Sequence, residues 1–121
     1  MKGNNLLLIE DDKNLVSNLK ELLEEEGYRL KITTDGINGI KLAKEWKPNL
    51  IICDVNIPRK DGYEVLSELS KDSSTKAIPF IFLTAKVEKE DLRKGMALGA
   101  DDYIFKPFNI EDLLNSIKLR R

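Results

Sequence analysis

The chain has 121 residues, of which 41% are hydrophobic and 34% are charged, and its formal net charge is −1. This balance is typical of a globular chain with one core, and we predict a single domain over residues 1–121. The near-neutral charge gives no indication of nucleic-acid binding, and no apolar run reaches the roughly 18 residues that a membrane span needs.

Apolar runs alternate with helical patterns from one end of the chain to the other. The runs predict strands at residues 6–9, 29–33, 50–53, 80–83 and 103–105. Apolar residues at helical spacing predict helices over residues 15–26, 37–47, 62–70, 89–98 and 109–119. Residues 72–76 have the composition of the most flexible loop.

Strands that alternate with helices favour a mostly parallel sheet covered on both faces. The runs 6–9, 50–53 and 80–83 are uniformly apolar and should be central, whereas residues 29–33 alternate and should form an edge. With right-handed crossovers, this predicts an α/β fold with a single doubly wound five-stranded parallel sheet in the flavodoxin-like order 2-1-3-4-5. Helices would lie on both faces, and the topological switch point would lie between the first and third strands.

Acidic side chains follow the strands that meet at this switch point. Glu10 and Asp11 follow the first strand, and Asp54 ends the third. Thr84 follows the fourth strand and Lys106 the fifth. Because the carboxyl ends of parallel strands share one edge of the sheet, these groups should converge and the carboxylates should repel one another. A divalent cation with oxygen ligands, Mg²⁺ or alternatively Mn²⁺, would relieve that repulsion.

Clustered acids, a hard cation, a lysine and a hydroxyl suit phosphoryl transfer, in which a carboxylate can be the nucleophile. The chain has no histidine, which excludes Ser-His and Cys-His catalysis and His-ligated metals. The glycines at 36 and 39 lack the lysine of a phosphate-binding loop. Asp12 is interpreted as a helix N-cap, Asp101 and Asp102 as structural or solvated, and Cys53 as a core residue.

Four segments, each placed at a predicted strand, carry a resemblance to a known family. They are Leu7-Leu8-Ile9-Glu10-Asp11-Asp12, Asp54-Val55-Asn56-Ile57-Pro58-Arg59-Lys60-Asp61-Gly62, Leu83-Thr84-Ala85 and Gly99-Ala100-Asp101-Asp102-Tyr103-Ile104-Phe105-Lys106-Pro107-Phe108. In this order, and over essentially the whole chain, the sequence resembles the receiver domains of two-component response regulators, including the chemotaxis regulators.

The resemblance implies a role for each matched residue. Asp54 would accept a phosphoryl group, with Lys106 pairing to its oxygens and Thr84 hydrogen-bonding to it. Mg²⁺ would be bound by Asp11 and Asp54 directly and by Glu10 through water.

The backbone carbonyl of Asn56 would complete this ligand set. Thr84 and Tyr103 would form the switch, with Tyr103 turning inward when Thr84 moves. The resemblance also implies a cis Lys106–Pro107 bond, and it places the side chains of Asn56 and Lys86 beside the phosphoryl group, where they would tune hydrolysis.

The function that follows is a phosphorylation-dependent signalling switch. A histidine kinase or phosphotransfer protein would donate the phosphoryl group, and the surface of helix 4, strand 5 and helix 5 would report it to an output domain or protein target. The domain would catalyse only its own phosphorylation and dephosphorylation. We expect a cytoplasmic protein, as a lone cysteine indicates, that is a monomer or a phosphorylation-dependent dimer, and that is a stand-alone regulator or part of a longer one.

Two other functions are compatible with parts of the sequence. An aspartyl-phosphate phosphatase of the haloacid dehalogenase kind needs a second acid two residues after the nucleophile, where this chain has Asn56. A pseudo-receiver would be a binding scaffold that never takes phosphate, although Asp54, Thr84 and Lys106 are all present.

Overall fold

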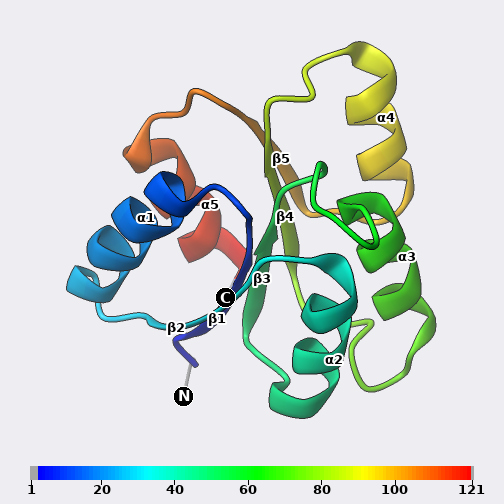
Figure 1. Ribbon diagram of the computed structural model, residues 1–121, viewed down its shortest axis with the longest axis horizontal. Coiled ribbons are helices and arrows are strands. Elements are labelled where there is room, and N and C mark those ends of the chain that lie inside the picture. The colour runs from blue at the N-terminus through cyan, green and yellow to red at the C-terminus, as the bar shows by residue number, and fades with distance from the viewer. Residues whose placement is uncertain (1–2, 121) are drawn as a thin grey trace.

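Five parallel strands form one sheet in the order β2-β1-β3-β4-β5 in the computed structural model (Figure 1). The strands are β1 (Asn5–Ile9), β2 (Arg29–Thr33), β3 (Leu50–Cys53), β4 (Phe80–Thr84) and β5 (Asp102–Phe105). The predicted order is confirmed, with β2 at one edge and β5 at the other. The structure describes residues 3–120, so Met1, Lys2 and Arg121, at the ends of the predicted domain, lie outside the described residues.

Helices cover both faces of the sheet, as predicted for a doubly wound fold. They are α1 (Lys13–Glu25), α2 (Gly36–Trp46), α3 (Gly62–Lys71), α4 (Lys89–Ala97) and α5 (Ile110–Arg120). In Figure 1, α1 and α5 lie on one side of the sheet and α2, α3 and α4 on the other. Within residues 3–120, no helix has the combination of length and apolar character that crossing a bilayer requires.

Alternation along the central strands divides the core into two layers. Side chains of consecutive strand residues point to opposite faces. Leu6 and Leu8 of β1 therefore join the layer beneath α1 and α5, while Leu7 and Ile9 join the layer beneath α2, α3 and α4. All four are at most 1% exposed. This two-sided burial explains why β1, β3 and β4 are continuous apolar runs, whereas β2, at the edge, is only half buried.

Aspartates stabilise the starts of two helices and the edge of the sheet where β4 and β5 begin. The side chain of Asp12 accepts hydrogen bonds from two amides of α1, and Asp61 forms a capping box at the start of α3. Asp101 accepts a hydrogen bond from the amide of Phe80, and Asp102 accepts one from the hydroxyl of Ser116. The structural interpretation of Asp12, Asp101 and Asp102 is confirmed.

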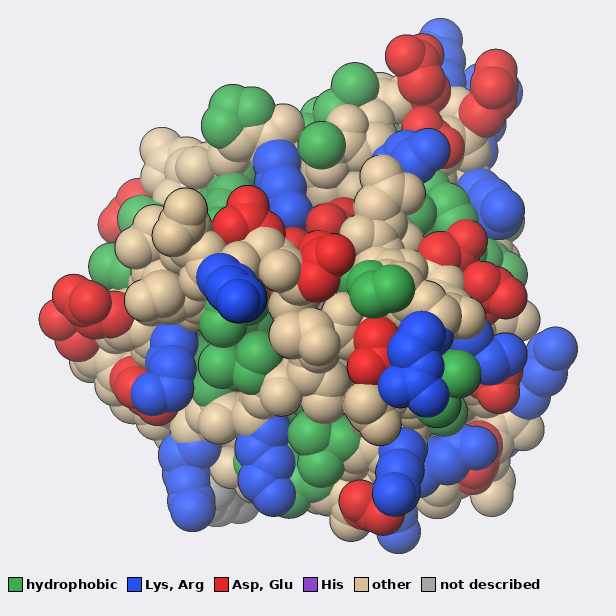
Figure 2. Space-filling view, viewed as in Figure 1, with side chains coloured by type: hydrophobic (Ala, Val, Ile, Leu, Met, Phe, Trp, Pro, Cys, Tyr) green, Lys and Arg blue, Asp and Glu red, His purple; other side chains and the backbone are tan. Residues whose placement is uncertain are grey.

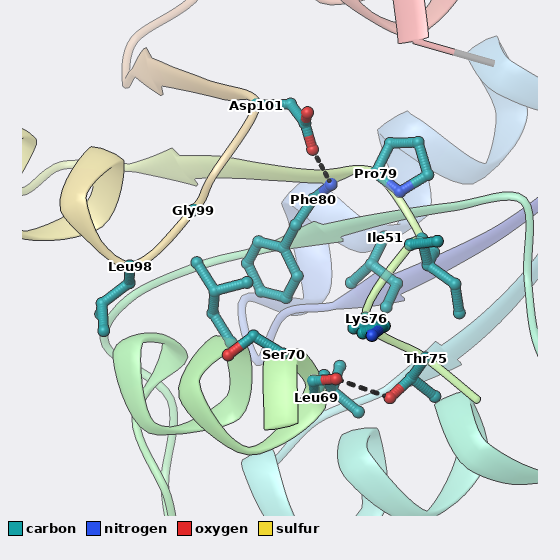
Figure 3. A pocket seen from close by; sticks show the side chains of 13 residues that line it. Ile51, Leu69, Ser70, Thr75, Lys76, Pro79, Phe80, Leu98, Gly99 and Asp101 are labelled. Carbon is teal, nitrogen blue, oxygen red and sulfur yellow. Dashed lines mark hydrogen bonds between the residues drawn. The ribbon is translucent and has the colours of Figure 1, made fainter. Parts of the chain in front are cut away.

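The segment 72–76, predicted as a loop, is a turn held by specific hydrogen bonds. The buried hydroxyl of Thr75 donates to the carbonyl of Leu69 at 2.7 Å (Figure 3). The side chain of Asp72 accepts from the amide and hydroxyl of Ser74. Polar composition indicated a loop, but it could not show that a threonine would close the turn onto α3. The turn lines a cavity of about 200 Å³ at the end of the sheet where β4 begins.

Replacing Thr75 with valine keeps the side-chain shape and removes this hydrogen bond. Because the Leu69 carbonyl then loses a buried donor, we expect the free energy of unfolding to fall by roughly 1 to 3 kcal/mol. Urea unfolding followed by circular dichroism measures the change. Ser73→Ala, an exposed change in the same turn, is the control and should be nearly neutral; equal losses for both variants would contradict the assignment.

Candidate functional site

Acidic groups from two adjacent strands meet at the carboxyl edge of the sheet. Glu10 and Asp11 directly follow β1, and Asp54 directly follows its neighbour β3. One carboxylate oxygen from each lies within 4.8 Å of the other two. Figure 2 shows acidic side chains gathered near the middle of this face, with lysine and arginine side chains around them. The predicted convergence of Glu10, Asp11 and Asp54 is present in the structure.

Lys106, just after β5, is the cation of this cluster. Its Nζ lies 2.8 Å from Oε1 of Glu10 and 3.1 Å from Oδ2 of Asp54. Both residues are buried, since Glu10 is 1% exposed and Asp54 is 8% exposed, whereas Asp11 is exposed to solvent. Three carboxylates thus face one ammonium, and two negative charges remain uncompensated within the cluster.

Burial and pairing change the acidity of two of these groups in the same direction. Burial raises the pKa of Glu10 above its usual range, although the hydrogen bond from Lys106 opposes the rise. Burial alone would lower the pKa of Lys106, but its hydrogen bonds to Glu10 and Asp54 and their charges raise it overall. The site therefore favours the protonated ammonium of Lys106 and disfavours the ionised form of Glu10 beside Asp54.

The loop between β3 and α3 is held by hydrogen bonds directly after Asp54 and at its end. The amide of Asn56 donates to Oδ1 of Asp54 at 3.4 Å, and the amide of Gly62 donates to the carbonyl of Val55 at 2.8 Å. A Cβ on Gly62 would lie 2.4 Å from the carbonyl oxygen of Asp54, so only glycine permits this approach.

The far side of the same loop is attached to the start of α2. The amide of Gly36 donates to the carbonyl of Pro58, and the buried carboxylate of Asp35 lies 3.5 Å from the guanidinium of Arg59. Arg59 has a φ of 73°, the left-handed region that a non-glycine residue adopts at some cost. These contacts fix the backbone that carries Asn56.

Thr84 is the last residue of β4, and Tyr103 lies on the neighbouring β5, where it pairs with Phe82. Thr84 is fully buried, and its hydroxyl accepts a hydrogen bond from the amide of Lys86 at 3.2 Å. Tyr103 is also buried, and its hydroxyl donates to the carbonyl of Lys86 at 2.9 Å. The peptide bond between Lys106 and Pro107 is cis.

Comparison with known proteins identifies the family. Residues 6–118 match the model of the response regulator receiver domain. The chain belongs to this family.

Its relatives include the transcriptional regulatory protein RprY of Bacteroides fragilis, which is 44% identical over 118 residues. That match covers 96% of this chain but only 49% of the relative, so the chain spans about half the length of the curated relatives it matches. Relatives of this kind are named as transcriptional regulators, not as conventional enzymes.

Two solved structures with bound metal show the same fold. The receiver domain of the sensor histidine kinase PA1611 from Pseudomonas aeruginosa, with a magnesium ion coordinated in its active-site cleft, has a TM-score of 0.90 and 28% identity. It is matched over 98% of this chain and 97% of that one. The Mn²⁺-bound form of response regulator Rcp1 has a TM-score of 0.81 and 31% identity, with 95% of this chain and 89% of that one covered.

Sequence reasoning missed the residues that support the site from behind. Asp35 and Arg59 were given no role, and Gly36 was considered only as part of a phosphate-binding loop, although an aspartate before the apolar pattern of α2 was an N-cap signal. That signal could not show that the same carboxylate also reaches the loop after Asp54. Nothing in the sequence indicated the hydrogen bond between Tyr63 and Tyr103, because the position of Tyr63 in α3 predicts only that it is buried.

Replacing Lys106 with methionine tests the electrostatic balance of the metal-free site. Glu10 and Asp54 would then lack their ammonium, and we expect the free energy of unfolding at neutral pH to fall by roughly 1 to 3 kcal/mol. Since Lys106 lowers the pKa of Glu10, the substitution should raise that pKa further. A folded-state pKa above the unfolded value means that folding takes up a proton, so the deficit should shrink as the pH falls through the raised pKa.

Urea unfolding at a series of pH values, without divalent ions, measures this deficit, and the ¹³C carboxyl resonance of Glu10 reports its titration. Lys60→Met is the control, because Lys60 pairs with Glu68 in a more exposed position and its loss should cost less. A Lys106→Met deficit that stays constant from neutral to acid pH would argue against the coupling with Glu10.

Proposed function

We propose that this domain is a phosphorylation-dependent signalling switch that accepts a phosphoryl group on Asp54. The observation that carries the proposal is the convergence of Glu10, Asp11, Asp54 and Lys106 at one edge of the sheet. Membership of the receiver family supports it. The donor would be a phosphohistidine of a histidine kinase or of a phosphotransfer protein.

The chemistry is an exchange of one bond for another. A carboxylate oxygen of Asp54 would form a bond to phosphorus, while the bond between phosphorus and the donor nitrogen breaks and its electron pair returns to the imidazole. Lys106 already lies 3.1 Å from Asp54 Oδ2, so its ammonium is placed to pair with phosphoryl oxygens. Hydrolysis of the acyl phosphate by water would restore the carboxylate.

The donor set fits Mg²⁺, with Mn²⁺ as an alternative. The ligand atoms of Glu10, Asp11 and Asp54 are all carboxylate oxygens, and two negative charges are left over by the pairing with Lys106. Asp11 and Asp54 would bind the ion directly, Glu10 through water, and Asn56 through its backbone carbonyl. When bound, the ion would neutralise charge on the transferred group. The magnesium and manganese in the related structures support this assignment.

Thr84 and Tyr103 would carry the change to the surface. In this proposal the Thr84 hydroxyl turns to the phosphoryl group, and Tyr103 occupies its buried position when Thr84 does so. The surface formed by α4, β5 and α5 would then favour or release an output domain or protein target, with a monomer-to-dimer change as one form of output. The names of the curated relatives support a transcriptional output.

The proposal also covers location and catalytic class. The only cysteine is buried and unpaired, which suits a reducing cytoplasm. The domain would act on its own aspartate and on no separate substrate. The two competing functions, a phosphatase and a scaffold that takes no phosphate, have no observation of their own in the structure, and the following test separates all three.

The first test is phosphorylation by acetyl phosphate in the presence of Mg²⁺. We expect one phosphoryl adduct per chain by intact mass spectrometry, because the proposal has a single acceptor, Asp54, with Lys106 placed 3.1 Å from its Oδ2. Asp54→Asn should give no adduct, while Asp61→Asn, which keeps a helix cap at the start of α3, should be modified normally. No adduct with any small donor would favour the scaffold, and rapid turnover of p-nitrophenyl phosphate would favour the phosphatase.

The second test is stabilisation by Mg²⁺ alone. At a magnesium concentration about 100 times the dissociation constant, a site present only in the folded state adds about 2.7 kcal/mol of stability. Thermal unfolding with and without Mg²⁺ measures this gain, which Asp11→Asn should largely remove. Asp12→Asn makes the same charge change one residue away and keeps the α1 cap, so it should retain the gain. Loss of the gain in both variants would point to general screening instead.

A further inference from the structure

Tyr103 occupies a closely fitted position in the core. Its ring lies edge-on or tilted to two phenylalanine rings, with centroid distances of 5.5 Å to Phe82 and 5.7 Å to Phe105. The ring is covered by α4, where the buried Gly95 packs against it. A Cβ on Gly95 would lie 2.9 Å from Cδ2 and 3.0 Å from Cε2 of the Tyr103 ring. Gly95 therefore leaves the space that the ring fills.

The hydroxyl end of Tyr103 meets a second tyrosine from another helix. Tyr63 lies on α3, and its hydroxyl is 3.1 Å from that of Tyr103 and 3.0 Å from the carbonyl of Asp91 in α4. The hydroxyl of Tyr103 is also 2.9 Å from the carbonyl of Lys86, in the segment before α4. The two tyrosine hydroxyls thus connect α3 and β5 with Lys86, just before α4, and with Asp91, near the start of α4.

Counting protons shows that these three hydrogen bonds cannot all form together. The two hydroxyls have one proton each, and two of the three contacts end on carbonyls that only accept. In one arrangement Tyr63 donates to Tyr103 and Tyr103 donates to Lys86. In a second, Tyr103 donates to Tyr63 and Tyr63 donates to Asp91. In a third, each hydroxyl donates to its carbonyl, and the two phenol oxygens face each other at 3.1 Å with no proton between them. The carbonyl of Asp91 lies inside α4 and has a helix amide as donor, so the first arrangement keeps the Lys86 carbonyl paired and avoids a contact between two phenol oxygens without a shared proton.

We propose that Tyr63 and Gly95 are positioning residues that hold Tyr103 in its buried orientation and so set the resting balance of the switch. This inference rests on the switch role proposed above for Tyr103. Tyr63 stabilises the buried orientation by donating to the Tyr103 hydroxyl, and Gly95 permits it by lacking a side chain. Tyr63 contacts Tyr103 from α3 and Gly95 contacts it from α4, so in this proposal both act through Tyr103 and not on the phosphoryl group.

The experiment measures the solvent exposure of the Tyr103 ring by NMR, using ¹³C-labelled tyrosine and a soluble gadolinium chelate. The chain has three tyrosines, so their ring signals can be assigned by substitution. We expect Tyr63→Phe to raise the ratio of exposed to buried Tyr103 about fivefold, the scale of one lost hydrogen bond. Gly95→Ala should raise it more. Tyr28→Phe, a buried tyrosine on the other face of the sheet, should leave it unchanged.

A second measurement separates positioning from a purely structural role. With Tyr103 present, Gly95→Ala should lower the melting temperature, because the methyl group and the ring compete for one space. In a Tyr103→Ala background the same change should raise the melting temperature, since alanine favours a helix over glycine. A fall in both backgrounds, or unchanged Tyr103 exposure in both Tyr63→Phe and Gly95→Ala, would overturn the inference.

Acetyl phosphate treatment of the same samples distinguishes this inference from the proposed function. If the unsubstituted chain forms no adduct, the proposed function fails whatever the ring signals show. If it forms the adduct while the ring exposure is the same in every variant, only the positioning role of Tyr63 and Gly95 fails.

Discussion

The central interaction of this domain is between two buried carboxylates, Glu10 and Asp54, and the single ammonium of Lys106. Glu10 and Asp54 are both within 3.1 Å of Lys106 Nζ, and Asp11 adds a third negative charge at the rim. Such a cluster is a poor source of stability, because desolvating charges costs much of what their attraction returns. Burial is the main cause of the raised pKa of Glu10, which is the same cost of desolvation. A cluster in this state gains most from a cation and from a transferred group that pairs with the lysine, as the proposed function requires.

The strands bring these groups to one edge of the sheet, but the loops around the sheet fix their positions. Parallel pairing of β1 with β3 brings Ile9 beside Cys53, so the residues that follow each strand meet without further adjustment. The backbone after Asp54 needs more support, because it leaves the sheet and carries the carbonyl of Asn56. Two close approaches supply it, at Gly62 against Asp54 and at Gly36 against Lys60. Arg59, in the same loop, has a left-handed backbone conformation, which is energetically unfavourable for a residue other than glycine.

The strand order and the acidic cluster were predictable because they depend on local patterns. Continuous apolar runs identified β1, β3 and β4 as central, and the alternation in β2 identified an edge. Acids placed after adjacent strands could only meet at one rim. Contacts between side chains of different helices were not predictable, because their sequence patterns indicate only burial. Tyr63 reads as an apolar position of α3, and Thr75 reads as part of a polar loop, yet each makes a specific hydrogen bond.

The same kind of contact connects the site to the surface in the structure. The backbone of Lys86 contacts two hydroxyls, since its amide donates to Thr84 and its carbonyl accepts from Tyr103. If the Thr84 hydroxyl turned toward a phosphoryl group, the Lys86 amide would lose its acceptor and the segment before α4 would have to adjust. The Lys86 carbonyl would move with it, and so would the best position for the Tyr103 hydroxyl. A bistable pair of phenols beneath α4 would then amplify a small movement at Thr84, because packed groups change between discrete arrangements more readily than they deform.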